Sequence, residues 1–70
     1  MPEDNSYHNP SSRLMSLAEV TEATTMSRFL IAALAKEGHF PKPIQLTVKR
    51  IAFVRAEVDS WIDERIATRK

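Results

Sequence analysis

The apolar positions between Ser16 and Pro43 recur with the spacing of two short helices joined by a turn. Ser16 and Glu19 fit a capping box, in which the serine oxygen accepts the N3 amide and the glutamate accepts the N–H of the cap residue. The positions that follow lie on one side of a helix of about two turns: Leu17, Val20 and Ala23 or Thr24. The pattern therefore predicts a first helix over residues 17–24.

A second helix is expected from Arg28 to Glu37. Thr24–Met26 interrupts the apolar pattern, and Ser27 is placed to cap the new helix. Gly38 stands where a helix ends on a residue with positive φ, and the two prolines that follow cannot continue it. The residues predicted to form the buried stripe have the spacing i, i+1, i+4: Leu30, Ile31 and Leu34.

Two brief apolar runs, Ile44–Leu46 and Ile51–Val54, predict a β-hairpin. The turn between them lacks an Asn-Gly or Gly-Gly pair. Arg13–Met15 is expected to be only a short extended segment before the first helix, so the hairpin has no other strand to join and leans on the helices. The exposed tip carries two cations, Lys49 and Arg50.

A third helix is predicted from Arg55 to about Thr68, with apolar residues at helical spacing up to Ile66. Trp61 is expected to be its main core aromatic residue, and Phe40 is expected to anchor the preceding turn in the core. Residues 1–12 are poor in apolar side chains and are expected to form a flexible tail. The predicted fold class is therefore mainly α with a small β-hairpin, a winged helix-turn-helix domain of three helices and a two-stranded wing over residues 13–70.

Composition excludes several kinds of site. The 70-residue chain has no cysteine, so neither a disulfide nor a thiolate metal site is available. Its single glycine rules out a glycine-rich phosphate loop, and its two histidines belong to no cluster with metal-ligand spacing. No apolar run approaches the roughly 20 residues of a membrane span. We therefore expect a cytosolic protein that is not an enzyme, binds no metal or cofactor and makes no membrane contact.

The charge is unevenly distributed, although the net charge is only +1. Residues 1–12 contain two acids and no lysine or arginine. The segment from Arg28 to Arg55 contains six cations and one acid, Glu37, and so carries a charge of +5. A local basic surface on a nearly neutral protein is typical of nucleic-acid binding, and an ordinary solvated surface is the equally weighted alternative.

The second helix supplies candidate base contacts, because the exposed N-terminal turns of a DNA-reading helix meet base edges. An arginine such as Arg28 can bridge guanine O6 and N7, and apolar side chains can meet a thymine methyl. The residues predicted to contact DNA from this helix are Ser27, Arg28, Phe29, Ala32, Ala33 and Lys36. Phosphate or minor-groove contacts are expected from Lys36, Lys42, Lys49 and Arg50. The apolar part of this helix face permits another interpretation, that it packs on a second protein.

Two stretches resemble a known family. Glu37–Pro43 (EGHFPKP) and Val58–Ile62 (VDSWI) occur in the order and spacing found in the AlpA family of small prophage and genomic-island proteins. The resemblance covers about residues 13–69. It implies a winged-helix fold related to MerR-type and excisionase DNA-binding domains, in a bacterial, DNA-associated protein of the cytoplasm.

The resemblance also implies a function and a site. Family members regulate integrase genes, or act as excisionases (recombination directionality factors) that bind and bend double-stranded DNA beside the attachment site and assist the integrase, or do both. Carried over to this sequence, the DNA-facing helix positions are Ser27, Arg28, Phe29, Ala32 and Ala33, and the wing is Thr47, Val48, Lys49 and Arg50. The family usually has glycine at the position of Thr25, and small polar, tyrosine and arginine residues at those of Phe29, Ala32 and Ala33.

Three functions stay open at this point. The first is an excisionase that binds near the attachment site, with the integrase as partner and with cooperative head-to-tail self-association on DNA. The second is a transcriptional regulator of the integrase or other element genes. The third, of another class, is an interaction module that recruits the integrase through the apolar face of the second helix.

Overall fold

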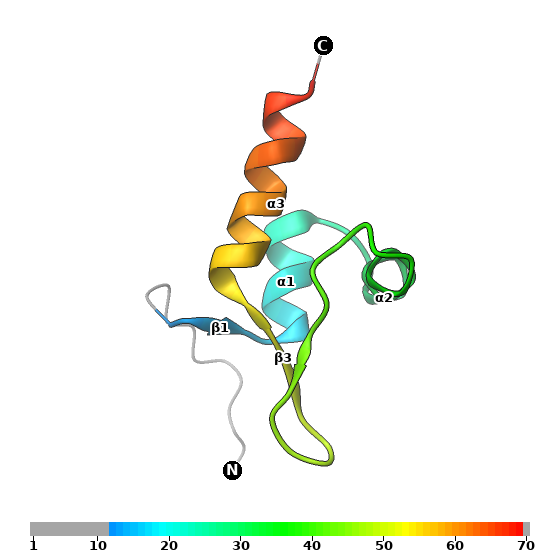
Figure 1. Ribbon diagram of the computed structural model, residues 1–70, viewed down its shortest axis with the longest axis vertical. Helices are drawn as coiled ribbons and strands as arrows, with labels where there is room; N and C mark the ends of the chain where they lie inside the picture. The colour runs from blue at the N-terminus through cyan, green and yellow to red at the C-terminus, as the bar shows by residue number, and fades with distance from the viewer. Residues whose placement is uncertain (1–11, 70) are drawn as a thin grey trace.

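The structure, a computed structural model, describes residues 12–69, which form three helices and three short strands (Figure 1). In chain order the elements are β1 (Leu14–Met15), α1 (Leu17–Thr24), α2 (Arg28–Lys36), β2 (Ile44–Gln45), β3 (Ile51–Val54) and α3 (Arg55–Ala67). The fold is mainly helical with a small antiparallel sheet, as the sequence predicts. Apart from Ser12, the tail predicted for residues 1–12 lies outside the described residues.

Both predicted helix caps are confirmed. Ser16 Oγ accepts the amide of Glu19 at 3.1 Å, and Glu19 Oε1 accepts the amide of Ser16 at 2.8 Å, which completes the capping box of α1. Ser27 Oγ accepts the amide of Leu30 at 3.1 Å at the start of α2. Between the two helices Thr25 adopts the left-handed conformation, with φ 62° and ψ 14°, and this reverses the chain.

α2 ends in a Schellman motif one residue before the predicted end. Gly38 has a φ of 83°, and its N–H donates to the Ala35 carbonyl at 3.1 Å. The N–H of His39 donates to the Leu34 carbonyl at 2.8 Å. Because these bonds satisfy the last carbonyls of the helix, the chain leaves α2 in a defined direction and places Phe40 in the core.

The sheet has one strand more than predicted. Its order is β1-β3-β2, with β3 antiparallel to both neighbours, and Met15 of β1 lies opposite Phe53. The expectation that Arg13–Met15 is only an extended segment, and that the hairpin has no other strand to join, is therefore wrong. The physical reason is that Met15 is buried in the core, where pairing with β3 satisfies the backbone groups beside it. A two-residue strand is too short to show an alternating pattern.

α2 presents a different side to the core than predicted. Ile31 is fully buried and Ala35 is 6% exposed, whereas Leu30 is 46% exposed. The expectation that Leu30 belongs to the buried stripe is wrong, and Leu34 is only partly buried. Residues 31 and 35 lie one turn apart on the same side of the helix, and residue 30 is rotated by about 100° from residue 31.

Among residues 12–69 the buried aromatic residues are Phe40 and Phe53, which are 3% and 2% exposed. Phe40 packs edge-on against Phe53, with ring centroids 6.0 Å apart, and against Trp61, with centroids 4.9 Å apart. Trp61 is only partly buried, so the expectation that it is the main core aromatic residue is wrong. Its indole N–H needs a hydrogen-bond partner and finds the His39 carbonyl at 2.7 Å, which holds the ring at the edge of the core.

The last turns of α3 extend beyond the rest of the molecule (Figure 1). Val58 is fully buried, and Ile62 packs against the core, but Ile66 is 54% exposed. The apolar spacing predicted for this helix therefore continues past the point where the other elements can cover it.

Replacing Thr25 by glycine is expected to stabilise the domain. A β-branched side chain in the left-handed region is strained, and glycine removes that strain at the expense of a more flexible unfolded chain. We expect Thr25→Gly to raise the free energy of unfolding by about 1 kcal/mol in urea titrations. Thr25→Ala keeps a Cβ and is the control that should gain much less. A destabilised Thr25→Gly variant would contradict this account.

Truncation of the core aromatic residues should separate their roles. Phe40→Ala removes a buried ring that contacts two others, and it is expected to cost about 3–5 kcal/mol, enough to unfold so small a domain. Trp61→Phe keeps a ring at the edge and removes only the indole hydrogen bond, so a loss of about 1 kcal/mol is expected. Thermal unfolding followed by circular dichroism measures both. Equal losses of unfolding free energy in the two variants would contradict the placement of Phe40 at the centre of the core and of Trp61 at its edge.

Candidate nucleic-acid interface

The side of α2 that faces away from the core is the candidate recognition surface. Its five residues are all exposed, and they follow one another around the helix from a position beside the buried Ala35 to the side opposite the buried Ile31 and Ala35. This arrangement follows from the helical period, since the residues on one side recur at intervals of three and four. The exposed residues are Arg28, Phe29, Ala32, Ala33 and Lys36.

A groove lies between α2 and the base of the wing. Arg28 and Lys36 line it from α2, Lys42 lines it from the loop before β2, and Ile51 lines it from β3. Apolar residues complete the lining: Leu17, Ile31, Ala32, Ala35, Pro43 and Phe53. The fold thus brings three of the cations predicted to contact DNA, two from α2 and one from the following loop, to one groove. A basic groove with apolar walls concentrates its field and attracts a polyanion.

In the first turn of α2 the side chain of Arg28 lies against the ring of Phe29. The guanidinium carbon of Arg28 lies 5.3 Å from the centroid of the Phe29 ring, within the range of a cation–π contact. Phe29 itself is 75% exposed, so the pair stands at the surface. Ser27 uses its oxygen as the helix cap, and the hydroxyl proton of that residue remains available for donation to a phosphate.

The predicted wing is the β2–β3 hairpin, whose loop projects at the end of the molecule opposite to α3 (Figure 1). The Leu46 amide donates to the Arg50 carbonyl at 2.8 Å, and the Arg50 amide donates to the Thr47 carbonyl at 3.4 Å. All four loop residues, Thr47 to Arg50, are exposed, and Val48 is 91% exposed. Because Ile51 lines the groove, the wing begins where the groove ends.

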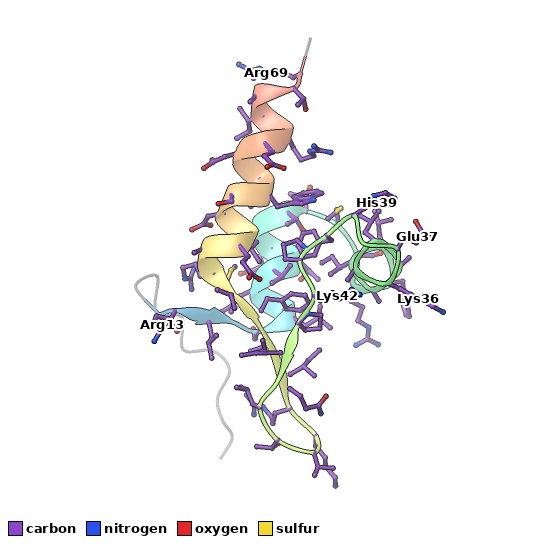
Figure 2. All side chains as sticks on the ribbon, viewed as in Figure 1. Arg13, Lys36, Glu37, His39, Lys42 and Arg69 are labelled. Carbon is purple, nitrogen blue, oxygen red and sulfur yellow. The ribbon has the colours of Figure 1, made fainter. Side chains whose placement is uncertain are left out.

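Two cations outside the predicted set lie elsewhere. Arg55 is half-buried, and its Nε donates to the Ser12 carbonyl at 2.6 Å while its amide donates to the Arg13 carbonyl at 2.8 Å. This cation of the basic segment therefore helps to hold β1 beside the start of α3. Figure 2 shows Arg13 at one side of the molecule and Lys36 at the other, with Lys42 between them.

One residue that the sequence did not single out contributes to the wing. Gln45 in β2 donates from Nε2 to the carbonyls of Thr47 and Val48, at 2.7 and 3.2 Å. A polar residue next to a turn without glycine is the only signal in the sequence for this role, and it is a weak one.

Residues 12–69 contain no group of three histidine or acidic side chains that could hold a metal ion. No helix among these residues is long and apolar enough to span a bilayer.

Two adjacent helices joined by a tight turn, with a β-hairpin projecting beside the second of them, define a winged helix-turn-helix protein. A family model described as the prophage CP4-57 regulatory protein (AlpA) matches residues 13–66. The chain belongs to this family, whose members are regulatory proteins rather than enzymes.

Two further comparisons complete this assignment. The chain is 36% identical over 58 residues to the uncharacterized protein ORF88 of Enterobacteria phage P4. The match covers 83% of this chain and 66% of that protein, so the chain spans slightly less than two thirds of its relative's length. No solved structure matches the chain significantly.

Proposed function

We propose that this protein binds specific double-stranded DNA sites of an integrated mobile element and acts as an excisionase, which assists the integrase at the attachment site. The observation that carries the proposal is the groove in which Arg28 and Lys36 of α2 meet Lys42 at the base of the wing. Membership of a prophage regulatory family supports the same assignment. The protein would act in the bacterial cytoplasm, bound to DNA.

The geometry suits α2 for the major groove. A helix about 10–12 Å across fits a groove about 12 Å wide, with its first turns at the base edges. In this pose Arg28 and Phe29 face the bases, and the alanines allow close approach. Lys36 and Lys42 neutralise phosphates at the groove wall, and Lys49 and Arg50 of the wing reach the adjacent backbone or minor groove.

Neutralising the groove cations should change the salt dependence of binding. Each phosphate contact contributes about −0.9 to the slope of log K against log salt concentration. We expect Lys36→Gln and Lys42→Gln each to make this slope shallower by about 0.9 and to weaken binding to all sequences alike. Fluorescence anisotropy on duplexes enriched by in vitro selection from random sequences gives the slopes.

Arg13→Gln is the matched control for these variants, because Arg13 lies on the other side of the molecule (Figure 2). It removes the same charge and should leave the slope unchanged. Slopes that change equally in all three variants would contradict the assignment of the groove.

Arg28 should carry sequence choice rather than general affinity. Arg28→Ala is expected to cost about 1–3 kcal/mol on the selected duplex and much less on random DNA, because a bidentate contact to guanine is lost. Competition anisotropy with both duplexes measures the ratio. Equal losses on the two duplexes would show that Arg28 contacts only the phosphate backbone.

A transcriptional regulator would use the same residues, so the assay must separate the two roles. Integrase-dependent excision is scored at the attachment-site junction with and without this protein, beside a reporter fused to the integrase promoter. The proposal requires that excision depend on the protein and on Arg28. A change in the reporter alone would assign the protein to transcriptional regulation.

One observation supports a function of another class, recruitment of a protein partner such as the integrase. Phe29 is 75% exposed and Leu30 is 46% exposed on the same helix, beside the exposed Ala33. An apolar surface of this kind also suits contacts between neighbouring copies on DNA. Phe29→Ser would abolish integrase capture while preserving DNA affinity if this second function holds.

A further inference from the structure

The tip of the wing carries a residue that is unusual for its position. Val48 is 91% exposed, more than any other large apolar side chain in the described part of the chain. It occupies the first central position of the turn that the Arg50 amide and the Thr47 carbonyl close. Glycine, proline, asparagine, aspartate and serine favour turns of this kind, and β-branched apolar residues do not. An exposed apolar side chain at a position where the turn favours other residue types indicates a functional position.

Side chains hold this tip in one conformation. Gln45 Nε2 donates to the carbonyls of Thr47 and Val48, at 2.7 and 3.2 Å, and Thr47 Oγ1 accepts the amide of Lys49 at 3.3 Å. None of the tip residues has a positive φ, so the turn differs from the glycine-dependent type common in hairpins. The side chains of Gln45 and Thr47 stabilise this turn, which in many other hairpins is made by glycine. They also fix the direction in which Val48 projects.

We propose that Val48 is an apolar wedge that the wing inserts at a base step of the minor groove, and that Gln45 is the residue that positions it. This inference rests on the proposed DNA binding. Apolar wedges flanked by cations partly unstack a base step and bend the duplex. Lys49 and Arg50 follow Val48 directly and supply positive charge for the neighbouring phosphates. A tip ordered in advance loses little conformational entropy on insertion.

Insertion also gives the exposed valine a favourable environment. Its two methyl groups leave water when they contact sugars and base edges, which stabilises the complex without any change in phosphate contacts. The wedge should therefore affect bending and affinity and leave the salt dependence unchanged. This separates its role from that of Lys49 and Arg50, whose removal lowers the salt slope.

The test measures bending by energy transfer between dyes at the two ends of the duplex enriched by in vitro selection. Wild-type protein is expected to raise the transfer efficiency. Val48→Thr keeps the shape and the branched Cβ but replaces one methyl group with a hydroxyl, and Val48→Ile keeps the apolar character. We expect Val48→Thr to lose most of the bending and about tenfold in affinity, with an unchanged salt slope, and Val48→Ile to keep both.

Gln45→Met keeps the length of the side chain and removes both donated hydrogen bonds. It is expected to reduce bending as much as Val48→Thr does, with the midpoint of thermal unfolding unchanged. The double variant should be no worse than either single variant, because the two residues act as one unit. A merely structural role for Gln45 would shift the unfolding midpoint and add to the effect of Val48→Thr.

The outcomes distinguish the two levels of the proposal. Wild-type protein that binds no selected duplex overturns the proposed DNA-binding function. Wild-type protein that binds, together with a Val48→Thr variant that bends DNA equally well, overturns the wedge alone. Bending that is lost in Val48→Thr and kept in Gln45→Met retains the wedge and overturns the positioning role of Gln45.

Discussion

The ring of Phe40 is the contact on which the arrangement of this small domain depends. It follows the end of α2 directly, and it packs edge-on against Phe53 of β3 and Trp61 of α3. The same residue therefore joins the segment that leaves α2 to the central strand of the sheet and to the last helix. Since β3 is also one strand of the wing, the contact links the segment that follows α2 to the base of the wing. Phe53, one of the rings that Phe40 packs against, also lines the groove between α2 and the wing.

A second constraint is that the chain must turn repeatedly with only one glycine. Gly38 takes the Schellman position at the end of α2, where a positive φ costs it nothing. The other two tight turns are made by other means. Thr25 accepts the left-handed conformation between α1 and α2, and Gln45 and Thr47 close the wing tip with side-chain hydrogen bonds. Both turns lie beside the candidate interface, one before α2 and one at the end of the wing.

Local signals predicted most of the fold, and non-local packing explains the errors. The capping box at Ser16 and the glycine after α2 act within a few residues, so the sequence alone locates these helix ends. Which side of α2 faces inward depends on its packing against α1 and the shared core, and here Ala35 takes the place expected for Leu30. Strand β1 exists only because β3 lies beside it, and Gln45 has a role only because the hairpin closes. The exposure of the predicted recognition residues follows from the helical period, but only the fold shows that three of them line one groove with Lys42. These three are Arg28, Ala32 and Lys36.

The composition of the recognition face bears on how such a protein would choose its site. On α2, Arg28 and Lys36 are the long polar side chains of the exposed face, and the residues between them are Phe29, Ala32 and Ala33. Such a face offers few hydrogen bonds to base edges, although it fits closely against thymine methyl groups. A protein with so little direct readout gains specificity from how easily a sequence deforms, since an easily unstacked step lowers the energy of the complex without being contacted by the helix. Under the proposed function, α2 and Arg28 set the register on the duplex. The wing then binds best where the neighbouring base step deforms easily. The two elements joined through Phe40 would then read different properties of the same DNA.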